Sequence, residues 1–227
     1  MTAGALIELT GVRAFAAAAP VTLRVQRGER VALLGRNGIG KSTLLRAMAG
    51  LTRPAAGSLR RPAAVGYVPQ DYRGSLLPWL SVLENVALPL RPLRLTRGER
   101  DARVDAAVSA VSLPSSLLDK MPQRLSGGEQ QLVAVARALT WQAPALLLDE
   151  ALSALDGSTR ASLRGRLGAF MDTRDLACVL VSHDIDDVLG LATRWVVLGG
   201  VAGEVVRDER TSVGRGPLES AVHGAAQ

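Results

Sequence analysis

The chain has 227 residues, of which 48% are hydrophobic, so it can bury a core and is not a disordered polymer. A membrane-spanning helix needs roughly 18 or more uninterrupted apolar residues, and Arg, Asp or Pro interrupts every candidate stretch. The formal net charge of +6 predicts an acidic partner, which composition alone leaves open between a nucleotide, a nucleic acid and an anionic membrane surface.

Predicted strands alternate with helices along the chain, which indicates an α/β fold. Residues 21–25 alternate apolar and polar side chains as a half-buried strand does, and residues 30–35 form an apolar run that ends in glycine. The next segment predicts a helix with one apolar face, made by Leu44, Leu45, Met48 and Leu51. Further buried strands are predicted at residues 145–150, 178–184 and 194–199.

From about residue 71 to residue 139 the pattern is helical, so we interpret this segment as a helical arm inserted in an α/β core. Three pairs in it have the spacing of a capping box, namely Ser81 with Glu84, Thr96 with Glu99, and Ser126 with Glu129. We expect a single domain over residues 1–227. Its parts would be a core of residues 1–70 and 140–207, a helical arm of residues 71–139 and a loosely ordered tail of residues 208–227.

The first chemical motif is GRNGIGKST at residues 35–43, between an apolar strand and an amphipathic helix. It fits the phosphate-loop pattern, in which glycines let backbone N–H groups turn toward a phosphate and the helix N-terminus adds positive potential. Lys41 can reach the β and γ phosphates, and the Ser42 hydroxyl can bind Mg²⁺. A merely structural glycine-rich turn would leave the match of both pattern and flanks unexplained. The predicted cradle consists of Gly35, Asn37, Gly38, Gly40, Lys41, Ser42 and Thr43.

Two carboxylates, Asp149 and Glu150, follow the apolar run at residues 145–148. Neighbouring strand residues point to opposite faces, so one carboxylate can face a metal while the next faces a water beside the γ phosphate. We expect Asp149 to hold Mg²⁺, directly or through water, and Glu150 to polarise the attacking water as a general base. The alternative is an ordinary solvated strand end, and the phosphate loop that precedes it favours the catalytic interpretation.

A Ser-Gly-Gly turn opens a helix within LSGGEQQ, residues 125–131, and taken alone it would only be a capping box. The order of phosphate loop, LSGGEQQ, LLLDE, SALD and VSHD, however, resembles the nucleotide-binding subunit of ATP-binding cassette (ABC) transporters over roughly residues 6–206. The resemblance implies a P-loop NTPase core of ABC ATPase type, with an N-terminal antiparallel β subdomain and an inserted helical subdomain. It also implies an ATP sandwich of two copies, because in this family the Ser-Gly-Gly helix start binds the γ phosphate held by the opposite copy.

The resemblance assigns roles to residues outside the phosphate loop. Ser126, Gly127 and Gly128 would bind the partner's nucleotide, and Asp156 of SALD would lie in a dimer-contact loop. Phe15 is the candidate for the aromatic that stacks on adenine, with a plain core position as the alternative. The catalytic set would be Lys41, Gln70, Glu150 and the γ-phosphate-sensing His183. The Mg²⁺ ligands would be Ser42, Gln70 and Asp149.

Three positions depart from the family pattern without removing a predicted ligand. Ala151 stands where proline usually follows the catalytic glutamate, which should loosen that turn. Leu132 replaces an arginine on the helix that follows the Ser-Gly-Gly turn, so a charged contact is missing there. Ile39 replaces a small residue in the phosphate loop. Each departure could alter the rate of hydrolysis.

The stretch LLPWLSVLENV, which follows Gln70, resembles ATPases of the nitrate, sulfonate, taurine and bicarbonate importer class. In the family this region receives a cytoplasmic helix of a permease, so we expect a permease to dock between Gln70 and Leu90. An extracytoplasmic solute-binding protein would act indirectly. A single cysteine, Cys178, and an N-terminus without an export signal fit a peripheral position on the cytoplasmic face of the plasma membrane.

The expected function is thus ATP hydrolysis that energises solute import through a separate permease, with ATP and Mg²⁺ as cofactors. An ABC exporter or lipid-handling ATPase is an alternative, because it would share every catalytic motif. A nucleic-acid-associated ATPase is a further alternative suggested by the basic charge. Aromatic residues make up only 3% of the chain and no long coiled-coil insertion interrupts the core, so we expect no nucleic-acid partner.

Overall fold

The computed structural model describes residues 4–200, 202–211, 216 and 218–220. A three-stranded antiparallel sheet of order β2-β1-β4 is formed by β1 (Ile7–Arg13), β2 (Val21–Val25) and β4 (Ala56–Arg60). A six-stranded sheet of order β5-β6-β7-β3-β8-β9 is formed by β3 (Arg30–Gly35), β5 (Gly66–Val68), β6 (Ala145–Asp149), β7 (Ala177–Val181), β8 (Arg194–Gly199) and β9 (Glu204–Arg210). Neighbouring strands from β5 to β8 are parallel, and β9 runs antiparallel to β8 at one edge.

The middle strands of the large sheet are buried on both faces. Every residue of β6 and β7 is buried, as the uninterrupted apolar runs predict. Side chains alternate across a strand, so successive residues of β6 pack into different cores. Leu147 belongs to the core shared with the antiparallel sheet and with α1 (Lys41–Ala49), whereas Leu146 and Leu148 belong to the core shared with the helices of the arm.

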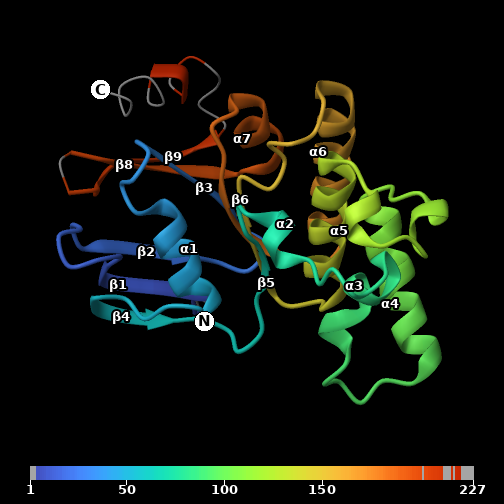
Figure 1. Ribbon diagram of the computed structural model, residues 1–227. Helices are drawn as coiled ribbons and strands as arrows, with labels where there is room; N and C mark the ends of the chain where they lie inside the picture. Colours follow the sequence, from blue (N-terminus) through green and yellow to red (C-terminus); the bar gives the residue numbers. More distant parts are fainter. Residues whose placement is uncertain (1–3, 201, 212–215, 217, 221–227) are drawn as a thin grey trace.

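The helical arm lies to the right of both sheets in Figure 1. Its α-helices are α2 (Tyr72–Ser75), α3 (Val82–Ala87), α4 (Arg97–Ala110) and α5 (Gly127–Thr140). Short 3-10 turns lie between them at η1 (Leu88–Leu90), η2 (Ser115–Leu117) and η3 (Pro122–Arg124). All three predicted capping boxes are confirmed, because Ser81, Thr96 and Ser126 each accept from the backbone N–H three residues on while that glutamate accepts in return.

Two more helices, α6 (Gly157–Asp172) and α7 (Ile185–Leu191), follow β6 and β7 and pack against each other. None of the helices in the described part of the chain has the length and apolar character needed to cross a membrane.

Two expectations about chain segments were wrong. Leu51 is 64% exposed, because α1 ends at Ala49 and Gly50, in the left-handed conformation at φ 78°, turns the chain away before residue 51. Residues 208–210 belong to β9 rather than to a loose tail, since their backbone pairs with β8 and the Asp208 carboxylate is bound to Arg194 of that strand. The expected tail otherwise falls mostly on residues 212–215, 217 and 221–227, outside the described residues.

Candidate active site

The carboxyl ends of the parallel strands meet at one edge of the large sheet and carry the predicted site. The phosphate loop follows β3, Gln70 follows β5, Glu150 follows β6 and His183 follows β7. The side chains surround a pocket of about 350 Å³. It is lined by Asn37, Gly38, Gly40, Lys41, Ser42, Thr43, Gln70, Glu150 and His183. Residues from four separate motifs therefore face one cavity.

Gly40 positions the phosphate loop against an aromatic ring. It is the N-cap of α1 at φ 110°, a conformation that favours glycine. A Cβ added there would lie 3.3 Å from Cε1 of Phe15 and 3.2 Å from Cβ of Ala14. Phe15 is 40% exposed, which excludes a fully buried core position for its ring. An exposed ring beside the phosphate loop is suited to stacking on a base.

The Lys41 ammonium lies within the phosphate loop. The residue is 6% exposed, and its Nζ donates to the carbonyl oxygens of Gly35 at 2.7 Å and Arg36 at 2.9 Å. Burial lowers the pKa of Lys41, although the carboxylates of Glu150 and Asp149 act in the opposite direction. A buried cation with two backbone acceptors is a fixed counter-charge for a phosphate.

Oxygen ligands suited to Mg²⁺ lie at the bottom of the site. The Ser42 hydroxyl donates to Oδ1 of Asp149 at 2.9 Å, and the Tyr67 hydroxyl donates to Oδ2 at 3.4 Å. Burial raises the pKa of the fully buried Asp149, while the bond from Ser42 opposes that rise. A hydroxyl beside a single carboxylate fits Mg²⁺, which commonly binds one or two carboxylates together with substrate phosphates. The described residues contain no cluster of three or more His, Cys, Asp or Glu side chains that would suit another kind of metal centre.

Glu150 and His183 are in contact in the lining of the pocket. Nε2 of His183 lies 3.2 Å from Oε1 of Glu150. Glu150 has a left-handed backbone at φ 52°, and its N–H donates to the carbonyl of Val181 at 2.9 Å. This strained backbone turns the chain away from the direction of β6, and the Glu150 side chain lines the pocket. Strained backbone conformations of this kind cluster at active sites.

The sequence prediction missed Gln131, which supports this turn. Its side chain is fully buried, accepts from the N–H of Ala154 at 2.9 Å and donates to the carbonyl of Glu150 at 3.3 Å. Ala151, expected to loosen the turn, is buried. A signal was present in the sequence, since Gln131 is a polar residue on the same helical face as the apolar Val135 and Ala138.

Asp187, also missed, holds the loop that carries His183. It is 2% exposed and accepts hydrogen bonds from Arg160 at 2.8 Å, Arg164 at 3.1 Å and the Ser182 hydroxyl at 3.0 Å. Arg160 also pairs with Asp184 at 2.9 Å. Residues on both sides of His183 are thereby tied to α6.

The remaining predicted residues lie outside the pocket. Ser126, Gly127 and Gly128 form the start of α5, beside α2 rather than beside the phosphate loop. Asp156 is the N-cap of α6 and accepts from the Ser158 hydroxyl at 2.6 Å and from the N–H groups of Ser158 and Thr159. These bonds, chiefly the one from the Ser158 hydroxyl, lower the pKa of its carboxyl. Leu132, in place of the family arginine, is buried in the arm core. The structure thus divides the predicted residues into a pocket group and an outlying group.

Comparisons with known proteins agree with this geometry. Residues 18–153, more than half of the chain, match the protein family described as ABC transporter. The chain belongs to the ABC transporter family. It is 38% identical over 215 residues to an aliphatic sulfonates import ATP-binding protein of Xanthomonas axonopodis pv. citri, covering 91% of this chain and 84% of that protein. It is also 39% identical over 188 residues to the nitrate import ATP-binding protein NrtC of a Synechocystis species. That match covers 78% of this chain and 28% of the longer protein.

Solved structures of ABC cassettes share the fold. A dimeric bacterial ABC transporter cassette superposes with a TM-score of 0.81 at 30% identity, covering 90% of this chain and 98% of that one. A dimeric cassette described as a post-hydrolysis state with bound ADP and phosphate gives the same TM-score at 29% identity. The predicted P-loop NTPase fold of ABC type is confirmed, and this ABC subunit is an ATPase.

Proposed function

We propose that two copies of this ABC ATPase enclose two MgATP molecules, and that closing and opening of the pair drives import of a small oxyanion through a separate permease. The division of the site carries this proposal. The phosphate-binding pocket is lined from one copy, while Ser126 at the start of α5 lies outside that lining. The start of a 14-residue helix offers free N–H groups and positive potential, which suits a phosphate held by a second copy.

Hydrolysis would occur by in-line attack of water on the γ phosphorus, which breaks the bond to the bridging oxygen of ADP. Glu150 would take the proton of the water, a role that contributes about 10²–10⁴-fold in rate. Lys41, His183 and Ser126 of the partner subunit would stabilise the charge on the phosphoryl oxygens. Ser42, Asp149 and Gln70 would hold Mg²⁺, which supplies charge neutralisation when bound.

An exposed apolar surface supports a permease partner. Trp79, Leu83 and Met121 are 69%, 39% and 42% exposed, and we call these three residues the docking surface. Two chain segments hold it together, because the N–H of Leu83 donates to the carbonyl of Leu118 at 2.9 Å and Gln123 donates to the carbonyl of Pro78 at 2.9 Å. Met121 extends the surface beyond the segment between Gln70 and Leu90 that the sequence predicted.

Import of an oxyanion is the activity that the relatives favour. Proteins similar to this chain are named for the import of aliphatic sulfonates and of nitrate. Deletion of the gene should abolish growth on an alkanesulfonate as the sulfur source, or on nitrate as the nitrogen source. If the parent strain expresses the protein and the deletion strain still grows normally on both the alkanesulfonate and nitrate, the oxyanion proposal is contradicted.

The oligomeric state of a Glu150→Gln variant tests the two-copy site. With hydrolysis blocked, MgATP should convert the monomer to a dimer on size-exclusion chromatography with light scattering. A second change, Ser126→Arg, should prevent the dimer while ATP still binds, since it obstructs only the outlying group. A dimer that persists with Ser126→Arg would contradict the role of α5 in binding the partner's nucleotide.

The docking surface is tested by co-purification with the permease. Leu83→Glu places a charge in the apolar surface and should reduce the recovered permease at least tenfold. Leu51→Glu is the matched control, because Leu51 is also exposed but lies after α1, outside the docking surface. Equal recovery of the permease by the two variants would show that docking occurs elsewhere.

A further inference from the structure

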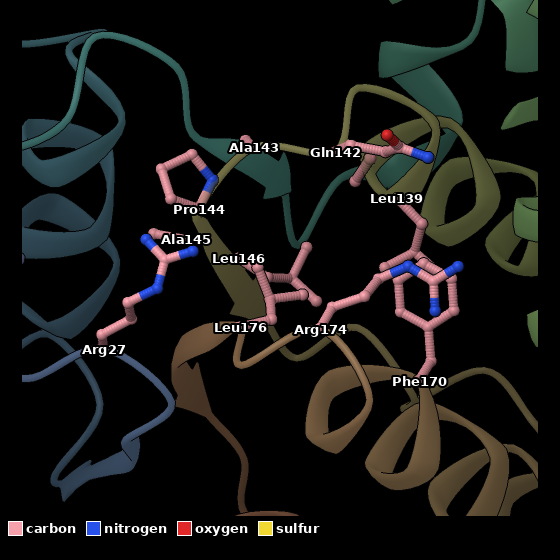
Figure 2. A pocket seen from close by; sticks show the side chains of 11 residues that line it. Arg27, Leu139, Gln142, Ala143, Pro144, Ala145, Leu146, Phe170, Arg174 and Leu176 are labelled. Carbon is pink, nitrogen blue, oxygen red and sulfur yellow. The ribbon is translucent and has the colours of Figure 1, made fainter. Parts of the chain in front are cut away.

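A second pocket of about 280 Å³ lies at the edge of the large sheet where β6 and β7 begin, whereas the ATP site lies where they end. Figure 2 shows Leu146 and Leu176 at its centre, with Ala143 and Pro144 along one side. These four residues are apolar and form the floor of the pocket, while most of the accessible lining around them is polar. Binding sites for small organic molecules typically combine apolar contact with polar groups that fix the orientation.

The polar side chains of this pocket are those of Arg27, Arg174 and Gln142, of which the two arginines are charged. The guanidinium carbon of Arg174 lies 3.8 Å from the centre of the Phe170 ring. Arg27 lies across the pocket from this pair in Figure 2 and forms an ion pair with Asp175 at 3.0 Å. Arg174 has no carboxylate partner among the described residues, and its guanidinium donates to the Thr173 hydroxyl at 3.2 Å.

The stacked guanidinium of Arg174 is already oriented. Stacking on an aromatic face limits the freedom of an arginine side chain, so less conformational entropy is lost when it binds an anion. Its planar donors match carboxylate, sulfonate and phosphate oxygens. Asp175 neutralises one of the two arginine charges by pairing with Arg27, so the charge of Arg174 remains and the pocket is positive.

We propose that this pocket binds a small organic anion, with its apolar body on Leu146 and Leu176 and its acidic group on Arg174. The apolar floor favours an organic anion over an inorganic one, because inorganic ions gain nothing from apolar contact. This proposal does not depend on the transported solute or on the two-copy site. It requires only the pocket and its unpaired guanidinium.

The pocket is connected to the ATP site by two elements. The last turn of α5 contributes Ala138 and Leu139 to the lining, and the same helix starts after Ser126. Strand β6 begins in the lining at Ala145 and ends at Asp149. At 1.5 Å per residue, the 14 residues of α5 span about 21 Å. A bound anion would therefore contact the far ends of two elements that build the nucleotide site.

The probe for this pocket is anilinonaphthalene sulfonate, which joins an aromatic body to one sulfonate and fluoresces when it leaves water. Its neutral counterpart, N-phenylnaphthylamine, has the same aromatic body without the acidic group. Titration of the full chain should give saturable binding of the sulfonate, at least tenfold tighter than binding of the neutral probe. Charge-assisted hydrogen bonds account for roughly this ratio.

Variants assign the binding to the pocket. Arg174→Gln should weaken the sulfonate probe roughly tenfold and leave the neutral probe unchanged. Arg166→Gln should change neither, because Arg166 is an exposed arginine of α6 outside the lining. Ala143→Leu, which fills the pocket, should weaken both probes. ATP binding of each variant checks that the chain is folded.

Three outcomes would overturn the proposal. Equal binding of the sulfonate by Arg174→Gln and by the unaltered chain would remove the role of the guanidinium. Displacement of the probe by MgATP would place it in the nucleotide site instead. Loss of the signal in Leu83→Glu would place it on the docking surface.

Discussion

The carboxamide of Gln131 donates to the backbone carbonyl of Glu150, 3.3 Å away, and so joins α5 to the turn of the proposed catalytic base within one subunit. The same side chain accepts from the N–H of Ala154 in the SALD segment. The helix whose start would bind the partner's nucleotide is therefore bonded to the base that would act on the subunit's own nucleotide. A displacement of α5 on dimer closure would reach Glu150 directly.

We expect Gln131→Met to lower kcat at least tenfold while the dissociation constant for ATP changes less than about twofold. The thioether keeps the volume but leaves the N–H of Ala154 without its partner, a loss that costs about 1–3 kcal/mol for a buried group. It also removes one of two donors to the carbonyl of Glu150, which keeps the N–H of Ser153 at 3.1 Å. Leu132→Met is the control, because it keeps an apolar side chain one position further along. Single-turnover hydrolysis and equilibrium binding separate the two effects. If kcat and the affinity for ATP fall by the same factor, Gln131 only stabilises the fold.

Phe15→Ala should weaken ATP binding by roughly 5- to 150-fold, the equivalent of about 1–3 kcal/mol for base stacking. Phe15→Trp should retain affinity, since any flat aromatic ring can stack on adenine. The melting temperature should change little, because the ring is 40% exposed. Equal dissociation constants for Phe15→Ala and the unaltered chain, measured by titration, would return Phe15 to a packing role.

Asp187→Ala should lower the free energy of unfolding by about 3–5 kcal/mol, because it removes a buried carboxylate that pairs with both Arg160 and Arg164. Arg160 keeps its pair with Asp184, whereas Arg164 loses its carboxylate. Asp186→Ala, at the exposed neighbouring position, provides the comparison and should cost much less. Urea denaturation followed by circular dichroism measures both. A loss below about 1 kcal/mol for Asp187→Ala would show that solvent compensates the two guanidinium groups.

Burial raises the pKa of the Cys178 thiol to about 12. The thiolate is the reactive form, so at pH 8 the native protein should react with a disulfide reagent far more slowly than a free thiol does. Addition of guanidinium chloride should release one reactive thiol per chain, because Cys178 is the single cysteine of the sequence. Rapid reaction without denaturant would indicate that β7 opens readily.

The sequence predicted those features that depend on nearby residues. The apolar runs of β3, β6 and β7, the phosphate loop and the three capping boxes each need only a short window of residues. Gln131 was missed because its partners lie 19 or more residues away in the chain, and Asp187 was missed because its arginine partners lie 23 or more residues away. Strand β9 was missed because its exposed, charged residues have the composition of a loop, and pairing with β8 makes them a strand. Propensity gives no account of such distant pairing.

The exposure of Trp79 gives the docking surface its own optical signal. The three tryptophans of the chain lie in different surroundings, with Trp195 fully buried, Trp141 partly covered at the end of α5 and Trp79 69% exposed. Quenching by acrylamide in water therefore acts chiefly on the Trp79 indole, whose emission also lies furthest to the red. Contact with a permease would shield that indole and shift its emission to shorter wavelengths, so assembly can be followed by native fluorescence without a label.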